Sequence, residues 1–233
     1  MSICGWLGAR LLIKPWAPRR RRVALAQWTA RRSLKAIGVD LEVEGEVPRS
    51  PFILVSNHRG YLDIGVLQAA ARVVFLSKTE IGQLPVIGWV VRLAGTVFVD
   101  RGEKRSGAAA LQSLGSALEE GQPVALFPEG KTGDGLSPGP FRHGAFRLAR
   151  ALEVPVVPVA VEYSTDEVAW TNPNDFSLIP HFFSLFSRKR IRARVVFGSA
   201  RSVDDIPAAA ESARIWIGDH LDLPERREAL LAA

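Results

Sequence analysis

The stretch Asn57-His58-Arg59-Gly60-Tyr61-Leu62-Asp63 decides how the rest of this chain can fold. The apolar run before it, residues 52–55, predicts a buried strand. The apolar spacing that begins at Tyr61 predicts a helix, and the glycine between the two supplies a turn. The sequence therefore places His58 at the carboxyl end of a strand and Asp63 in the first turn of a helix.

The spacing of His58 and Asp63 predicts a base and the carboxylate that orients it. On a regular helix the two side chains would point about 140° apart, but a bend at Gly60 can fold the imidazole back over the helix start. The helix dipole favours an ionised carboxylate there. A carboxylate bonded to one ring nitrogen leaves the other nitrogen able to take a proton. The alternative is a histidine that only stabilises a strand-to-helix turn.

Composition limits the classes of protein that this chain can represent. It has 233 residues, of which 47% are hydrophobic and 23% are charged, which is typical of a globular domain with one core. The single cysteine excludes an internal disulfide. The net charge of +6 indicates an anionic partner, which can be a nucleic acid, a membrane surface or a phosphorylated substrate.

The N-terminal residues carry much of the positive charge. No acidic residue precedes Asp40, and tryptophan and leucine at helical spacing are interleaved with these cations: Arg10, Lys14, Arg19, Arg20, Arg21, Arg22, Arg31, Arg32 and Lys35. This pattern suits helices in a membrane interface, and no apolar run reaches the length of about 18 residues that a spanning helix needs. We expect residues 1–39 to form basic amphipathic membrane-association helices of a peripheral (monotopic) protein on the cytoplasmic face of the cell membrane, where they bind anionic lipids.

Two other interpretations of the basic segment stay open. It can be a solvated helix pair packed on the following domain. It can also bind nucleic acid, but no nucleic-acid-binding motif accompanies the charge, so we expect no nucleic acid partner.

Residues 40–233 alternate strands with helices, which predicts a single α/β domain with a mixed, largely parallel sheet flanked by helices. Strands are expected at 41–45, 52–55, 73–76, 96–99, 124–127, 156–161 and 192–197, and helices at 61–70, 108–120, 144–152 and 208–221. Two apolar segments have open roles: 81–93 can line a groove or belong to the core, and 164–187 can face a membrane or belong to the core.

Polar residues follow four of the predicted strands, namely His58, Lys78, Arg101 and Glu129. Open α/β sheets bind ligands at the carboxyl ends of their strands, so these groups can converge on one crevice. The planar guanidinium of Arg101 suits a phosphate, and the glycine-rich backbone after Glu129 can approach a ligand closely. A surface ion pair and a simple turn are the alternatives for these two features.

With these residues identified, the chain resembles the glycerophospholipid acyltransferase family, typified by 1-acyl-glycerol-3-phosphate acyltransferases. The resemblance covers roughly residues 40–200 and follows the order of the family's blocks. The matching residues are Asn57, His58 and Asp63; then Val97-Phe98-Val99-Asp100-Arg101; then Phe127-Pro128-Glu129-Gly130; and last Val156-Val157-Pro158-Val159.

The resemblance implies transfer of an acyl group from a thioester, acyl-ACP or acyl-CoA, to the free hydroxyl of a lysophospholipid. The implied acceptor is 1-acyl-sn-glycerol-3-phosphate, which gives phosphatidic acid, with His58 as general base oriented by Asp63. Head-group binding is implied for Lys78 and Arg101, and a contribution to the pocket for Asn57, Glu129 and Gly130. Neither a bound cofactor nor a metal is implied.

One departure from the family pattern concerns the head group. The third block commonly continues with threonine and a phosphate-gripping arginine, whereas this chain has Lys131 and Thr132. Lys131 is a point charge without a bidentate fork, and Arg142 is another candidate cation. A lyso-ornithine lipid is therefore the alternative acceptor.

Two rival functions belong to other classes. One is a non-catalytic membrane-surface binding protein, against which the intact His58, Asp63 and Glu129 argue. The other is a hydrolase, for which the chain lacks a Gly-x-Ser-x-Gly nucleophile elbow.

Overall fold

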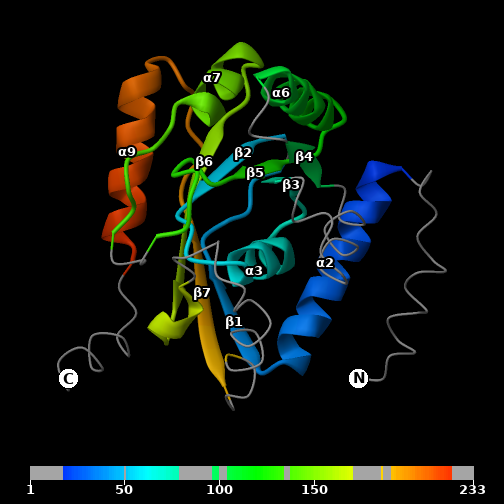
Figure 1. Ribbon diagram of the computed structural model, residues 1–233, viewed down its shortest axis with the longest axis vertical. Coiled ribbons are helices and arrows are strands. Elements are labelled where there is room, and N and C mark those ends of the chain that lie inside the picture. The colour runs from blue at the N-terminus through cyan, green and yellow to red at the C-terminus, as the bar shows by residue number, and fades with distance from the viewer. Residues whose placement is uncertain are drawn as a thin grey trace.

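A seven-stranded sheet lies at the centre of the computed structural model (Figure 1), which describes residues 18–49, 51–78, 96–99, 104–133, 137–169, 185 and 190–221. The strands are β1 (Val39–Glu44), β2 (Ile53–Ser56), β3 (Val74–Lys78), β4 (Val97–Val99), β5 (Val124–Leu126), β6 (Val156–Tyr163) and β7 (Ile191–Phe197). The helices are α2 (Arg19–Ala36), α3 (Leu62–Ala70), α6 (Lys104–Glu119), α7 (Gly144–Ala151), the 3-10 turn η1 (Asp166–Val168) and α9 (Ile206–Asp219).

The strand order is β1-β7-β6-β2-β5-β3-β4, and every neighbouring pair is parallel except β6 with β7. Five strands therefore run in one direction, and β1 and β7 run in the other. Because β2, β5, β3 and β4 are parallel neighbours, their carboxyl ends lie along one edge of the sheet. The expectation of a mixed, largely parallel sheet flanked by helices is confirmed.

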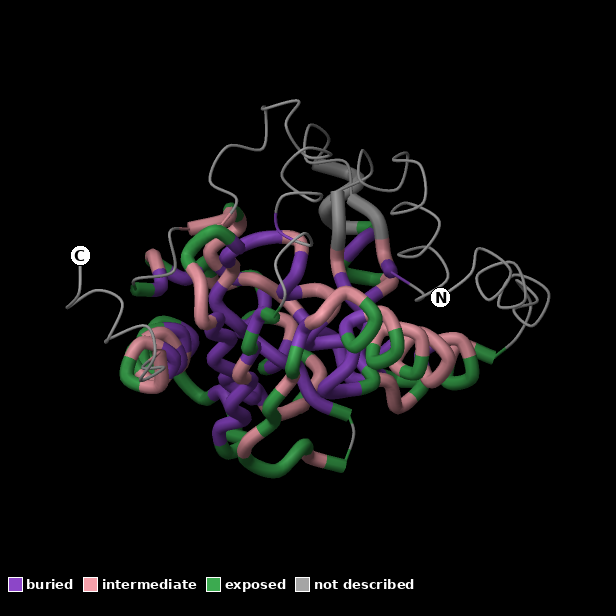
Figure 2. The backbone as a smooth tube through the Cα atoms, turned by 90° about the horizontal axis from the view of Figure 1, so that it is seen from below, coloured by how far each residue is buried: buried purple, intermediate pink, exposed green. Residues whose placement is uncertain are grey.

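Alternation along the strands divides the apolar side chains between two cores. In β2, Leu54 packs in the first core with residues of α2 and α3, whereas Ile53 and Val55 pack in the second core with residues of α6, α7 and α9. The helices accordingly cover both faces of the sheet (Figure 1). Buried residues are concentrated in the middle of the molecule (Figure 2), and every residue of β2 and β6 is buried. A strand that is covered on both faces favours apolar residues on both of them, which explains the continuous apolar run at residues 52–55.

Helix α2 is packed on the domain by polar as well as apolar contacts. The Arg31 Nε and Gln27 Nε2 atoms donate to the carbonyl of Ala69, at 2.8 and 3.3 Å, near the end of α3. These bonds satisfy a carbonyl that the last turn of a helix leaves unpaired. On the exposed side, Trp28 is 50% accessible and the Arg32 guanidinium lies 4.3 Å from its ring centroid.

The predicted division at residue 39 stays a prediction, because residues 1–17 lie outside the described part of the chain. Among the described helices, none is long and apolar enough to cross a membrane. The expected elements otherwise appear with small shifts. Helix α6 begins at Lys104, ahead of the expected 108, and β6 continues two residues past 161 because β7 pairs with it through Tyr163. Segment 81–93 lies outside the described residues, and so do residues 170–184, 186 and 187 of segment 164–187.

Gly45 is a position at which the fold excludes a side chain, and it gives a test of the β1–β7 packing. Its φ is +78°, and an added Cβ would collide with the Phe197 carbonyl oxygen of β7. We expect Gly45→Ala to lower the free energy of unfolding by about 2–4 kcal/mol, measured by urea denaturation. Gly121→Ala is the matched control, since Gly121 has a similar φ of +74° but no atom within 4 Å of the added Cβ. Equal losses in the two variants would contradict the packing.

Candidate active site

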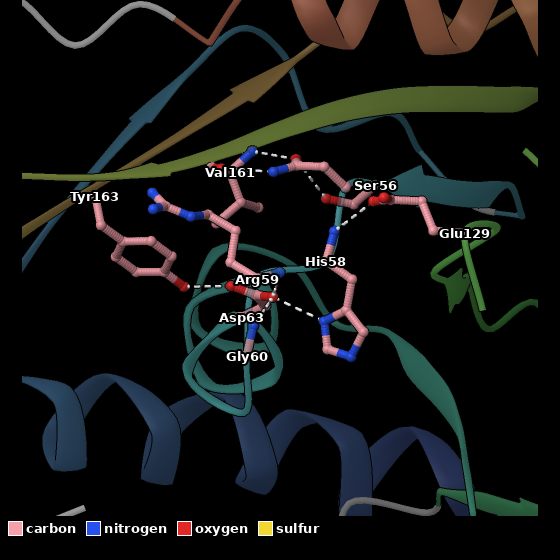
Figure 3. A network of polar contacts seen from close by, with 9 residues as sticks. Ser56, His58, Arg59, Gly60, Asp63, Glu129, Val161 and Tyr163 are labelled. Carbon is pink, nitrogen blue, oxygen red and sulfur yellow. Dashed lines mark hydrogen bonds and ion pairs between the residues drawn. The ribbon is translucent and has the colours of Figure 1, made fainter. Parts of the chain in front are cut away.

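The structure brings His58 and Asp63 into direct contact (Figure 3). The Nδ1 atom of His58 lies 2.8 Å from Oδ2 of Asp63. The bend predicted at Gly60 is present, because the backbone N–H groups of Arg59 and Gly60 both point to the same carboxylate oxygen, at 2.6 and 2.9 Å. The carboxylate at the start of α3 thus reaches back over the turn and binds the N–H groups that precede the helix.

Asp63 is completely buried and accepts hydrogen bonds at both oxygens. Oδ2 accepts from the His58 ring and from the two turn amides, and Oδ1 accepts from the Tyr163 hydroxyl at 2.8 Å. An ionised carboxylate needs such donors when it leaves water. Since the carboxylate accepts, the proton of a neutral His58 belongs on Nδ1, and Nε2 is the nitrogen that can take a proton.

The ring of His58 is held in one plane while one edge stays accessible. It stacks on Phe127 with a centroid distance of 3.9 Å and an interplanar angle of 12°. The side chain is 19% exposed, and Nε2 lies on the side of the ring away from Asp63 (Figure 3). Within the described ranges no residue bonds to Nε2. The arrangement therefore presents an oriented base to an incoming group.

Glu129 and the loop after β5 hold the backbone of His58. The Glu129 Oε1 atom accepts from the His58 N–H at 2.9 Å, and Oε2 accepts from the Gly139 N–H at 3.0 Å. The Gly133 N–H donates to the His58 carbonyl at 2.7 Å. Burial raises the pKa of Glu129 above its ordinary value of 4.5, although the hydrogen bonds from the Gly139 and His58 N–H groups oppose the shift.

Asn57 is occupied by the neighbouring strand. Its Nδ2 atom donates to the Val161 carbonyl and its Oδ1 atom accepts from the Val161 N–H, both at 2.9 Å. Only 2% of the residue is exposed. Substrate binding by Asn57 stays a prediction, and these contacts favour a structural role in joining the ends of β2 and β6.

Among the remaining predicted binding residues, the structure describes Gly130, Lys131 and Arg142 but not the side chains of Lys78 and Arg101. Gly130 has a φ of +72°, and an added Cβ would lie 2.8 Å from the Arg142 guanidinium carbon, so glycine makes room for that exposed arginine. Lys131 is exposed as well. Lys78 ends β3, but its side chain lies outside the described residues, and so does Arg101. The described part of the chain holds no cluster of three metal-ligating side chains.

Three contributors to the site were not predicted from the sequence: Arg59, Phe127 as a stacking surface, and Tyr163. Arg59 is completely buried and its Nη2 atom donates to Asp166 Oδ1 at 2.7 Å. Its guanidinium carbon lies 5.8 Å from the Tyr163 ring centroid. Alternation along β6 places Tyr163 on the same buried face as Val159 and Val161, but only the structure shows that the Tyr163 hydroxyl meets Asp63.

The family that this fold and site define is also indicated by comparison with known sequences. A family model described as Acyltransferase matches residues 39–162, which is more than half of the chain. The chain belongs to the acyltransferase family. The resemblance noted from the four sequence blocks is thereby confirmed.

Individual relatives give more detail. The chain is 37% identical to a lyso-ornithine lipid O-acyltransferase of Pseudomonas aeruginosa, over 72% of this chain and 65% of that protein. It is 31% identical to a 1-acyl-sn-glycerol-3-phosphate acyltransferase of Neisseria meningitidis, over 71% of this chain and 66% of that protein. The chain thus spans about two thirds of the length of these curated relatives.

The fold also matches a solved structure. This is the crystal structure of PlsC, the 1-acyl-sn-glycerophosphate (LPA) acyltransferase from Thermotoga maritima, with a TM-score of 0.63 at 21% identity. The match covers 98% of this chain and 90% of PlsC. At this identity the match supports the shared fold.

The raised pKa of Glu129 predicts a pH-dependent difference between the wild type and Glu129→Gln. A carboxyl whose pKa is raised on folding binds its proton more tightly in the folded state, so the contribution of Glu129 to wild-type stability falls as pH rises from about 4.5 to the folded-state pKa. Glutamine does not titrate, so the variant lacks this pH-dependent contribution to stability. We expect the unfolding free energy of the wild type minus that of the variant to decrease over this range, measured by urea denaturation between pH 4 and 8. A constant difference would contradict the shift.

Proposed function

We propose that this protein transfers an acyl group from an acyl thioester to a hydroxyl of a lysolipid, with His58 as general base and Asp63 as its orienting carboxylate. The observation that carries the proposal is the 2.8 Å contact between Nδ1 and Oδ2 of these residues. It directs Nε2 toward the accessible side of the ring. No serine or cysteine nucleophile is needed for this reaction.

The reaction can be written with this chain's own groups. Nε2 of His58 takes the proton of the acceptor hydroxyl while the oxygen attacks the thioester carbonyl carbon. The carbonyl electrons move to oxygen and then return as the carbon–sulfur bond breaks. The leaving thiolate takes the proton back from Nε2. Asp63 stabilises the imidazolium that exists between these steps, and the Phe127 stack holds the ring in place.

The acceptor is the finer part of the proposal. The relatives' names support a lysolipid, and they include both lyso-ornithine lipid and 1-acyl-sn-glycerol-3-phosphate acyltransferases. Thr132, where family members commonly carry a phosphate-gripping arginine, supports the lyso-ornithine acceptor. Arg142 beside Gly130 supports lysophosphatidate, because it provides a guanidinium after the same strand.

The acyl donor and the location at the membrane are also proposals. Acyl-ACP and acyl-CoA both supply the required thioester. We infer peripheral attachment to the cytoplasmic face of the cell membrane. The exposed Trp28 beside Arg32 on α2 supports it, since tryptophan and arginine side chains suit the head-group region of a bilayer.

The first prediction from this proposal concerns the base. With purified full-length protein in detergent, we expect acyl transfer to lysophosphatidate, lyso-ornithine lipid or both, from acyl-ACP or acyl-CoA. His58→Ala should lower kcat at least about 100-fold, because a general base contributes that much or more. His143→Ala, which removes another imidazole after β5, is the matched control and should keep wild-type activity.

Each of the other outcomes identifies a rival. Thioester loss without lipid product would indicate a hydrolase. Vesicle binding with no histidine-dependent product from any acceptor would favour the non-catalytic membrane-surface protein. Equal activity of wild type and His58→Ala would contradict the assigned role of the imidazole.

A second prediction concerns the head group. If Arg142 binds the phosphate of lysophosphatidate, Arg142→Ala should raise KM for that acceptor about 10-fold, the equivalent of about 1.4 kcal/mol, while KM for lyso-ornithine lipid changes less than about 2-fold. Arg150→Ala removes another exposed arginine, in α7, and should change neither value. A parallel rise for both acceptors would contradict a phosphate-specific role.

A further inference from the structure

The carboxylate of Asp63 has two oxygens with very different surroundings. Oδ2 accepts three hydrogen bonds, all from residues 58–60 of its own turn. Oδ1 accepts from Tyr163, which lies 100 residues further along the chain. The donors at Oδ2 all belong to the local turn, so the Tyr163 hydroxyl is the described donor from a distant strand that restricts rotation of the carboxylate about its Cβ–Cγ bond.

Tyr163 is itself rigidly placed. It is the last residue of β6, is completely buried, and is paired in register with Ala193 of β7. The Arg59 guanidinium carbon lies 5.8 Å from its ring centroid, and an ion pair with Asp166 holds that guanidinium. The hydroxyl therefore has little freedom to move away from Oδ1.

The hydroxyl also stays protonated. Burial, together with the neighbouring Asp63 carboxylate, raises the pKa of Tyr163 well above its ordinary value of 10.0. Throughout the physiological pH range the tyrosine is consequently a hydrogen-bond donor to Oδ1.

We propose that Tyr163 is a positioning residue that holds the Asp63 carboxylate at the angle at which Oδ2 binds His58, and that its O–H bond to Oδ1 limits how strongly the pair retains the imidazolium proton. The inference rests on the proposed function for its kinetic consequence. The charged and titratable side chains around the pair, among those described, are Arg59, Glu129, Tyr163 itself and Asp166.

The direction of the effect follows from charge. A donor at Oδ1 withdraws negative charge from the carboxylate, so its loss leaves more charge on Oδ2 beside Nδ1. The protonated imidazole is then stabilised and loses its proton at a higher pH. Tyr163→Phe keeps the ring and removes only the hydroxyl.

The experiment compares wild type and Tyr163→Phe in the full-length protein. We expect kcat to fall about 10-fold with KM for the acceptor unchanged, and the acidic limb of the kcat–pH profile to move upward by about half a pH unit, the size expected for one lost hydrogen bond. NMR titration of the His58 ring, one of four histidines, should show the same upward shift. The titration requires no turnover, so it tests the positioning even if acyl transfer itself is not observed.

A control separates positioning from stability. Ile217→Val removes a methylene from a completely buried side chain of the second core, in α9. It should lower the melting temperature but leave the pH profile and the His58 titration unchanged. An unchanged His58 titration in Tyr163→Phe, or the same kinetic loss in Ile217→Val, would overturn the proposal.

A second perturbation covers the case in which Tyr163→Phe does not fold. Incorporating 3-fluorotyrosine keeps the ring and makes the hydroxyl a stronger donor. It should therefore shift the His58 titration downward. An upward shift or no shift would overturn the proposal.

Discussion

The fully buried carboxylate of Asp63 is the constraint on which the rest of the site depends. A carboxylate removed from water must find donors for both of its oxygens, or the folded state loses several kcal/mol. Here the donors come from the end of β2, from the turn before α3 and from the end of β6. The requirement fixes the relative position of two neighbouring strands and one helix, and the imidazole is one of the groups held in place.

His58 is also held by residues that follow a neighbouring strand. The strand β5 lies next to β2, so the residues that follow it can bind the backbone N–H and carbonyl of His58 and stack on its ring. Catalysis by proton transfer needs a base whose position is set before the substrate arrives. Since none of these supports uses Nε2, the ring is held firmly without blocking the nitrogen that we propose takes the proton.

The sequence was most informative where function depends on short-range geometry. The contact of His58 with Asp63 and the bend at Gly60 were predictable, because both lie within seven residues. The approach of Glu129 to His58 was predictable in outline, since each follows a parallel strand. The detailed role of Asn57 was not, because its amide pairs with the backbone of Val161, 104 residues away. Tyr163 was missed for the same reason.

The sequence by itself determined the α/β class, the positions of most of the described strands and helices to within a few residues, and the pairing of His58 with Asp63. Only the tertiary structure decided which strands are neighbours. Strand order therefore decided that the Tyr163 hydroxyl donates to the second carboxylate oxygen of Asp63 and that Asn57 joins β2 to β6. The physical reason is that hydrophobic periodicity records which side of an element is buried but not which element covers it. Strand order follows from the packing of the whole chain, and the hydrogen bonds between distant residues follow from that order.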